Sequence, residues 1–283
     1  MELHGYSQSL GIPSVREKVA ESLNRRFGMQ YTGNHIFMTT GAAGAIAHAI
    51  RCVAQPGDEV LTFAPYFPEY NPYINLTGAN LKIVPADTKS FQINFEAFEQ
   101  MLTEKVMAVL INTPNNPSGI VYSTETIREL ARIMTEKQEQ YGHEIYLISD
   151  EPYREIIFDG VDAPYPSKFY RNTLSCYSFS KSLSLPGERI GYVAVNPACT
   201  DAELITSMCG QISRGTGHNC PPSIIQLAVA EVLDLTADLS VYETNMNILY
   251  RELTELGFDC VKPGGTFYMF PKALEEDAVA FSE

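Results

Sequence analysis

Residues 173–182 read Thr-Leu-Ser-Cys-Tyr-Ser-Phe-Ser-Lys-Ser, an apolar run that ends in two hydroxyl groups and an amine. A short run of this kind, rich in β-branched and aromatic residues, predicts a buried strand. In open α/β sheets the loops that follow the carboxyl ends of strands form the ligand crevice. Ser178, Ser180 and Lys181 are therefore candidate site residues, and the polar residues that end the other strands should be considered with them.

Similar runs recur along the whole chain and alternate with segments of helical periodicity. The expected strands lie near 59–64, 81–85, 106–113, 144–150, 173–180 and 189–195. The expected helices lie near 14–27, 43–54, 124–140, 200–212, 222–235 and 239–256, with Thr124 as a candidate N-cap. This alternation predicts an α/β fold with a mostly parallel central sheet and helices on both faces.

The end of the chain departs from this pattern. The long helix expected near 239–256 is followed by Gly257 and a strand-like segment at 266–270, which predicts a second, smaller α+β domain. We expect a large domain over residues 1–238 and a partial small domain over 239–283. A motif-like segment begins almost at the first residue, and the last residues stop inside a starting helix. Truncation at both ends is therefore expected.

The composition limits the possible partners. The 283 residues contain 20 Lys and Arg against 34 Asp and Glu, a net charge of −14, which disfavours nucleic acid and anionic membranes. The six cysteines form no CxxC pair, so we expect reduced thiols rather than a disulfide frame or a metal site. With no basic leader and no apolar run of membrane length, a cytoplasmic location is expected.

Small residues follow the expected strand that ends at residues 39–40. The order Gly41-Ala42-Ala43-Gly44 before a helix would let backbone N–H groups approach a phosphate. Tight packing of the helix against a strand explains the same residues equally well. The GxGxxG and P-loop patterns do not occur, which disfavours dinucleotide and ATP binding.

A carboxylate ends the expected strand at 144–150. Asp150 would lie at the carboxyl edge of the sheet, where an unpaired buried charge is costly, so it requires a cationic partner. A protonated pyridine nitrogen would serve, because cofactors with such a ring recruit a lysine Schiff base and an acidic partner. An ordinary salt bridge or a helix cap is the alternative.

Lys181 and Arg189 add an amine and a planar cation to the same edge. Burial and a nearby positive charge both lower the pKa of a lysine and give the neutral amine that Schiff-base chemistry needs. The fork of Arg189 suits phosphate oxygens. A solvated surface lysine is the alternative, and the neighbouring motifs disfavour it.

Taken together, the motifs resemble those of a known enzyme family. Asn-Pro-Ser-Gly at 116–119, Asp-Glu-Pro-Tyr at 150–153, Ser-Phe-Ser-Lys at 178–181 and Gly-Glu-Arg-Ile-Gly-Tyr at 187–192 have the order and spacing of fold-type-I pyridoxal-phosphate-dependent aminotransferases, class I/II, of the aspartate aminotransferase superfamily. The resemblance extends from Tyr6 to Tyr268. It implies the pyridoxal-phosphate-dependent transferase fold of type I.

The resemblance also implies roles for individual residues. Lys181 would carry pyridoxal 5'-phosphate as a Schiff base, and Asp150 would pair with the pyridine nitrogen. Tyr153 and Asn116 would hydrogen-bond the 3-oxygen of the ring. Lys181, Asp150 and Tyr153 are the residues expected to act in catalysis.

The remaining expected contacts surround the ring and the phosphate. Phe67 would stack on the ring, with Tyr66 as the weaker candidate. The phosphate would be bound by Gly41, Ala42, Ala43, Ser178, Ser180 and Arg189. Tyr6 would reach the phosphate in the partner subunit, which implies a homodimer.

The implied reaction moves an amino group from an amino acid to a 2-oxo acid by a ping-pong mechanism, with freed Lys181 as general base. In the family an arginine that grips the substrate α-carboxylate lies in a C-terminal region beyond residue 283, so the amino donor cannot be read from these residues. Arg214 is a candidate for reading a side-chain carboxylate, and a surface role fits it equally well.

Three alternatives stay open at this point. A β-eliminating C–S lyase would use the same cofactor residues on the same fold. A cofactor-sensing domain of the kind fused to DNA-binding regulators is disfavoured by the strong negative charge. The chain could also bind the cofactor without turnover.

Overall fold

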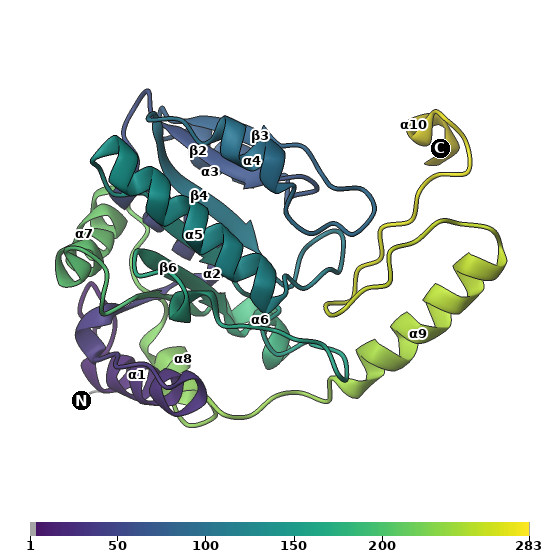
Figure 1. Cartoon of the computed structure of the whole chain (residues 1–283). Helices are drawn as coiled ribbons and strands as arrows, with labels where there is room; N and C mark the ends of the chain where they lie inside the picture. Colours follow the sequence, from purple (N-terminus) through teal and green to yellow (C-terminus); the bar gives the residue numbers. More distant parts are fainter. Residues whose placement is uncertain (1–3, 283) are drawn as a thin grey trace.

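The computed structural model describes residues 4–282, and within them seven strands form one sheet (Figure 1). In chain order the strands are β1 (Ile36–Thr39), β2 (Glu59–Phe63), β3 (Asn80–Val84), β4 (Val106–Asn112), β5 (Tyr146–Asp150), β6 (Thr173–Ser178) and β7 (Gly191–Val195). Their order across the sheet is β1-β7-β6-β5-β4-β2-β3. Only β7 runs antiparallel to its neighbours, so the predicted mostly parallel sheet is confirmed.

Helices cover both faces of this sheet, as the sequence predicted. Helices α2 (Gly41–Val53), α3 (Tyr70–Asn75) and α7 (Ala202–Gly215) pack on one face. Helices α1 (Pro13–Phe27), α4 (Phe95–Met101), α5 (Thr124–Tyr141) and α8 (Ser223–Val229) pack on the other. The single turn α6 (Phe179–Ser182) follows β6 directly.

The central strands are apolar on both faces because both faces are covered. In β4, Ala108 and Leu110 enter the core beneath α2, whereas Val109 and Ile111 enter the core beneath α5. Continuous burial of this kind is typical of parallel sheets. The polar residues therefore collect where the strands end, and the register places Asn112 of β4 beside Asp150 of β5.

Several local predictions need correction. The N-cap of α5 is Ser123, whose hydroxyl accepts from the Thr126 amide, whereas Thr124 begins the helix and donates to Asp162. Helix α8 ends at Val229 rather than near 235. Helices α3 and α4 were not predicted, because six and seven residues are too few to show a helical period.

The strand-like segment at 266–270 is not a strand. Thr266 has a φ of 62°, which breaks an extended conformation. The Gly264 and Gly265 amides donate to the Gly119 carbonyl and the Thr266 amide donates to that of Ile156, so only two isolated bridges form nearby, at Gly265 and Pro271. This segment is therefore held by hydrogen bonds to loops and not by pairing with a strand.

Helix α9 (Ser240–Glu255) points away from the sheet, and α10 (Ala278–Ser282) lies beyond it (Figure 1). The start of α9 packs through Met246 on a small apolar cluster that contains Tyr153 and Ile156. The division into domains at 238/239 stays a prediction. None of the helices in residues 4–282 is both long and apolar enough to cross a membrane.

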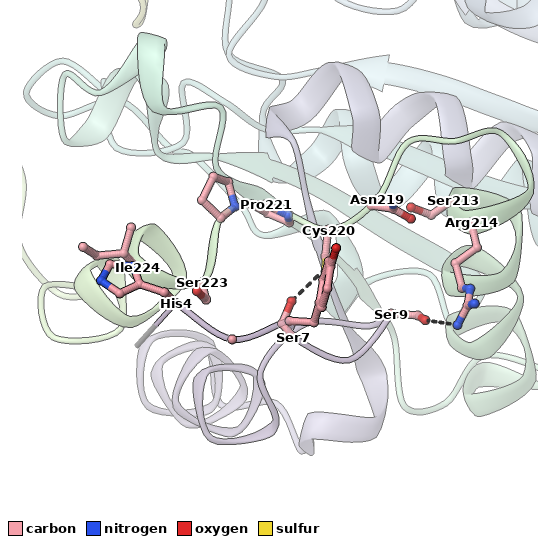
Figure 2. Close-up of a pocket in the computed structure, with 13 residues that line it drawn as sticks. His4, Ser7, Ser9, Ser213, Arg214, Asn219, Cys220, Pro221, Ser223 and Ile224 are labelled. Atoms are coloured by element: carbon pink, nitrogen blue, oxygen red, sulfur yellow. Dashed lines mark hydrogen bonds between the residues drawn. The ribbon is translucent and has the colours of Figure 1, made fainter. Parts of the chain in front are cut away.

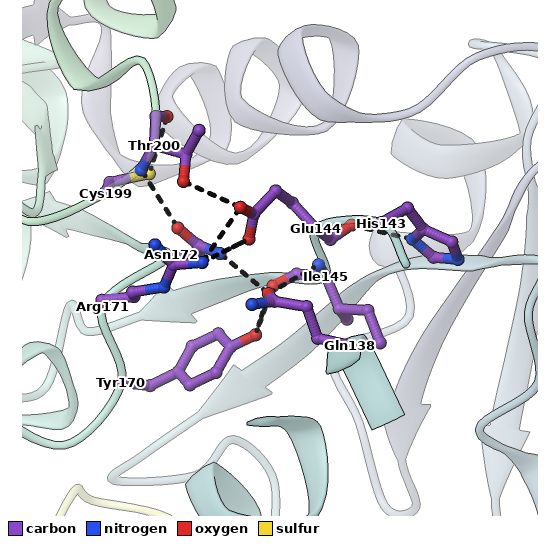
Figure 3. Close-up of polar contacts among 9 residues, drawn as sticks. All are labelled: Gln138, His143, Glu144, Ile145, Tyr170, Arg171, Asn172, Cys199 and Thr200. Carbon is purple, nitrogen blue, oxygen red and sulfur yellow. Dashed lines mark hydrogen bonds and ion pairs between the residues drawn. The ribbon is translucent and has the colours of Figure 1, made fainter. Parts of the chain in front are cut away.

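A polar cluster holds the amino edge of the sheet together (Figure 3). Glu144, before β5, accepts hydrogen bonds from Arg171 at 3.0 Å and from the Thr200 hydroxyl at 2.9 Å, and it also contacts Asn172. Gln138 of α5 accepts from Asn172 at 2.9 Å. These bonds join α5, β5, β6 and the approach to α7 at the edge opposite the predicted site.

Candidate active site

A cavity of about 350 Å³ lies at the carboxyl edge of the sheet. The predicted site residues that line it are Ala42, Ala43, Phe67, Asn116, Asp150, Tyr153, Ser178, Ser180, Lys181 and Arg189. Tyr66, the weaker candidate for stacking, is not among its lining residues. The ends of β4, β5 and β6 and the start of α2 therefore bring distant segments to one place.

Asp150 lies at the end of β5 and is 5% exposed. Its Oδ2 accepts from the Tyr70 hydroxyl at 2.6 Å and from Asn112 Nδ2 at 3.4 Å. Its Oδ1 is enclosed and has no partner among the described residues. Burial raises the pKa of Asp150 to about 7, against the opposing effect of the Tyr70 hydrogen bond.

The unpaired Oδ1 of Asp150 indicates which chemical group the cavity can bind. A buried carboxylate oxygen without a partner is costly, and a cationic donor in the cavity would remove that cost. A protonated ring nitrogen is such a donor, and it would also return the pKa of Asp150 towards its ordinary range. The Asp150 side chain therefore fits the role that the resemblance implied.

Lys181 lies in the single turn α6, directly after β6. The turn is capped by Ser178, whose hydroxyl accepts from the Ser180 amide at 3.1 Å. Lys181 Nζ lies 5.1 Å from the ring centre of Phe267 and 5.8 Å from that of Tyr153. Burial, and then the positive charge of Arg189, lower the pKa of Lys181 and favour a nucleophilic neutral amine.

We use the name anion cradle for the start of α2 at Gly41 together with Arg189, Ser178 and Ser180. An Arg189 guanidinium nitrogen lies 3.0 Å from where a Cβ on Gly41 would be, and Gly41 has a φ of 81°, so a side chain here would both crowd Arg189 and strain the backbone. Thr40 Oγ1 contacts His218 Nε2 at 2.9 Å instead of capping the helix. The Ser178 and Ser180 hydroxyls meet at 2.6 Å nearby. Helix N–H groups, a guanidinium and hydroxyls are suited to a phosphate.

The family model described as "Aminotransferase class I and II" matches residues 1–283. The chain belongs to the class I and II aminotransferases. It is therefore a transferase of nitrogenous groups, and the members of its family depend on pyridoxal phosphate.

Solved and curated relatives agree with this assignment. A crystal structure of an aminotransferase from Eubacterium rectale is 45% identical, has a TM-score of 0.96 and is matched over 99% of this chain and 70% of that chain. The aspartate aminotransferase of Thermotoga maritima is 30% identical over 98% of this chain and 71% of its own length. The aspartate/prephenate aminotransferase of Thermus thermophilus is 30% identical over 93% and 68%. The predicted fold type I is thus confirmed.

The cavity of this aminotransferase also contains residues that the sequence motifs did not predict. Asn112 joins two predicted residues, because its Oδ1 accepts from the Asn116 amide at 2.6 Å and its Nδ2 donates to the Asp150 carbonyl at 2.9 Å. Its position at the end of β4 was a signal, since every polar strand end was a candidate. Tyr73 and Tyr268 also line the cavity, and the Tyr268 hydroxyl lies 3.0 Å from that of Tyr153.

Tyr6 and Arg214 line a different cavity of about 640 Å³. In Figure 2 the Arg214 side chain reaches Ser9 of the N-terminal segment, with 3.4 Å between Nη1 and Oγ. Tyr6 is fully exposed, as a residue that reaches into a partner subunit would be in one chain alone. Its predicted contact with a partner's cofactor, and the carboxylate-reading role of Arg214, stay predictions.

Proposed function

We propose that this chain transfers an amino group from an amino acid to a 2-oxo acid, using pyridoxal 5'-phosphate bound in the 350 Å³ cavity. One observation carries the proposal: Asp150, whose buried Oδ1 is unpaired, lines that cavity together with Lys181 and the cradle beside Arg189. An acceptor for a ring nitrogen, an amine for an aldehyde and a cradle for a phosphate match the three polar parts of this cofactor.

The same residues would hold the cofactor. Lys181 Nζ would bind the aldehyde carbon covalently, and Asp150 would accept from the ring nitrogen. Asn116 and Tyr153 would hydrogen-bond the 3-oxygen, and Phe67 would pack on the ring. The residues that would bind the phosphate are Gly41, Ala42, Ala43, Ser178, Ser180 and Arg189.

When bound, pyridoxal phosphate supplies an electron sink for the pair of electrons left at the substrate Cα. Facing a positive ring nitrogen, Asp150 would stay ionised and would keep that nitrogen protonated. Lys181 Nζ would accept the proton from the substrate Cα, because its lowered pKa favours the neutral amine, and would donate that proton to the aldehyde-derived carbon of the cofactor. The first oxo acid leaves before the second binds, so we expect ping-pong kinetics.

We also propose a homodimer in which Tyr6 completes the phosphate site of the partner subunit, and a cytoplasmic location. The location is supported by the six cysteines, all of which are free thiols. Two relatives have names that include aspartate, so aspartate is the first amino donor to test.

Trapping with borohydride tests the assignment of Lys181. The full chain is loaded with pyridoxal phosphate, reduced and digested, and the modified lysine is located by mass spectrometry. We expect the adduct on Lys181 and no adduct in Lys181→Ala, while Lys168→Ala, at an exposed position outside the cavity, behaves as the wild type. An adduct at another lysine in the wild type would overturn the assignment.

Spectra recorded with amino donors test the reaction itself. Amino acids added to the loaded chain should convert the cofactor from its aldehyde to its amine form, with one 2-oxo acid released per site. Release of pyruvate and ammonia from a sulfur amino acid, without that spectral change, would favour the C–S lyase instead.

A further inference from the structure

Two thiols meet where α2 packs against α7. Cys52 lies in the last turn of α2 and Cys209 lies within α7, and their Sγ atoms are 3.3 Å apart across a sequence separation of 157 residues. Cys209 is fully buried, whereas Cys52 is partly exposed. Solvent thus reaches one member of the pair and not the other.

The packing of the two helices fixes this approach. Ala45 and Ala49 of α2 share one core cluster with Ile205 and Cys209 of α7. Cys52 Sγ also lies 3.9 Å from the Ile205 carbonyl oxygen. A disulfide needs the sulfur atoms about 2.0 Å apart, so closure requires a movement of about 1 Å. Cys52 lies in the last turn of α2, two residues before Ala54 becomes extended, and helix ends fray more readily than helix interiors.

We propose that Cys52 and Cys209 form an oxidisable dithiol site whose oxidant is a small disulfide such as oxidised glutathione. The Cys52 thiolate attacks one sulfur of that disulfide, the S–S bond breaks and one glutathione thiolate leaves. The Cys209 thiolate then attacks Cys52 Sγ, forming the protein disulfide and releasing the second glutathione. The protein loses two electrons and two protons, and the oxidant is reduced to two thiols.

The burial of each thiol sets this order. The first attack needs access to solvent, which Cys52 has. The contact with Cys52, together with burial, raises the pKa of the Cys209 thiol and makes it a poor first nucleophile. Cys209 is nevertheless in van der Waals range of Cys52 Sγ, which suits the second, intramolecular step.

The cross-link would join two elements that contribute to different cavities. Helix α2 begins at Gly41 of the anion cradle, and α7 ends beside Arg214. A bond between them would fix their relative position. Its formation is measured without cofactor or substrate, so the proposal does not rest on the proposed function.

The test treats the full chain with oxidised glutathione, alkylates the remaining thiols and identifies peptides by mass spectrometry. We expect a peptide that joins Cys52 to Cys209, with loss of two of the six thiols at these positions, reversed by reductant. Cys209→Ser and Cys209→Ala should stop at a glutathione adduct on Cys52. Cys52→Ser should leave Cys209 unmodified. Cys260→Ser, at another partly exposed thiol, should form the same cross-link as the wild type.

Two results would overturn the proposal. One is a wild-type chain that stops at a glutathione adduct on Cys52 while Cys209 stays free. The other is a cross-link from Cys52 to Cys176, the buried thiol of β6, in place of Cys209. Circular dichroism of the reduced variants checks that each has folded.

Discussion

Among single residues, Asp150 is subject to opposing effects on its ionisation. Burial favours its neutral form, whereas a cofactor nitrogen needs it ionised. The Tyr70 hydroxyl, which donates to Oδ2 at 2.6 Å, lowers the pKa of Asp150 and opposes burial. Tyr70 is itself fully buried, so this hydroxyl has little freedom to find another acceptor. We therefore regard Tyr70 as a positioning residue for Asp150.

Tyr70→Phe should weaken cofactor binding, because it removes a hydrogen bond to a carboxylate worth about 1.5–3 kcal/mol. The expected loss of affinity is roughly tenfold to a hundredfold. Without this bond the pKa of Asp150 rises further, so the affinity profile should also shift to higher pH. Absorbance titrations with pyridoxal phosphate at several pH values measure both effects.

Tyr66→Phe is the matched control for that experiment. Its ring stacks on Tyr70 at 6.4 Å, but it is not among the residues that line the cavity. Its affinity for the cofactor should be that of the wild type. Equal losses in the two variants, or an unshifted pH profile in Tyr70→Phe, would rule out the role given to the Tyr70 hydroxyl.

The site residues that could be predicted are those whose position follows from the residues next to them in the sequence. Asp150 and Lys181 each follow an apolar strand, so strand ends alone placed both at the sheet edge. Tyr70 is 80 residues from Asp150, and Tyr268 is 115 residues from Tyr153. The residues around these two tyrosines in the sequence do not predict which residue each tyrosine contacts, because tertiary packing alone determines those contacts.

At the scale of elements, length decided what could be predicted. Helix α5 has 18 residues and shows its period clearly, whereas α3 and α4 are too short to do so. The segment at 266–270 has the composition of a strand, but the Thr266 amide donates to Ile156, and the preceding Gly264 and Gly265 amides donate to the turn at Gly119. Strand composition does not guarantee a partner strand.

A side chain added at Gly119 would displace the segment at 266–270, which contacts this turn. A Cβ on Gly119 would lie 2.5 Å from the Tyr268 carbonyl oxygen and 2.8 Å from Pro263 Cβ, and its φ is 72°. Gly119→Ala should therefore cost about 2–4 kcal/mol of unfolding free energy, from overpacking and from the positive φ together. It should also move Tyr268 away from Tyr153 and weaken cofactor binding.

Gly142→Ala separates the two causes of that loss. Gly142 ends α5 with a φ of 73°, and nothing lies within 4 Å of its added Cβ. Its cost should be about 1 kcal/mol, with cofactor affinity unchanged. Urea unfolding and cofactor titration compare the variants. If Gly119→Ala loses no more stability than Gly142→Ala and binds the cofactor normally, the segment does not depend on this contact.

At the scale of the whole molecule, the proposed dimer predicts shared sites. Tyr6→Phe should lower cofactor affinity about tenfold, the order expected for one hydrogen bond to a charged phosphate. Lys181→Ala should prevent covalent attachment. In a hybrid of the two variants, one site would combine an intact Lys181 with Tyr6 from the other subunit.

Mixing the two variants should thus restore a high-affinity, borohydride-trappable site in a fraction of the dimers. Titration of the mixture after subunit exchange measures that fraction. If the mixture only averages the two separate variants although exchange has occurred, Tyr6 does not act across subunits.

The stability of the cofactor-free molecule should also report on Asp150. Its pKa is about 7 in the folded chain against an ordinary value of 3.8, so between these values the folded state binds more protons than the unfolded state. Stability must then fall as pH rises through this window and level off above about pH 7. Relative to Asp150→Asn, the wild type should lose about 2 kcal/mol between about pH 5.5 and pH 8, at about 1.4 kcal/mol per pKa unit.

Asp87→Asn should show no such trend against the wild type, because hydrogen bonds from Ser90 and Lys89 hold the pKa of Asp87 below its ordinary value. Urea unfolding followed by circular dichroism measures the difference, and a pH-independent gap between the wild type and Asp150→Asn would show that Asp150 is ionised throughout.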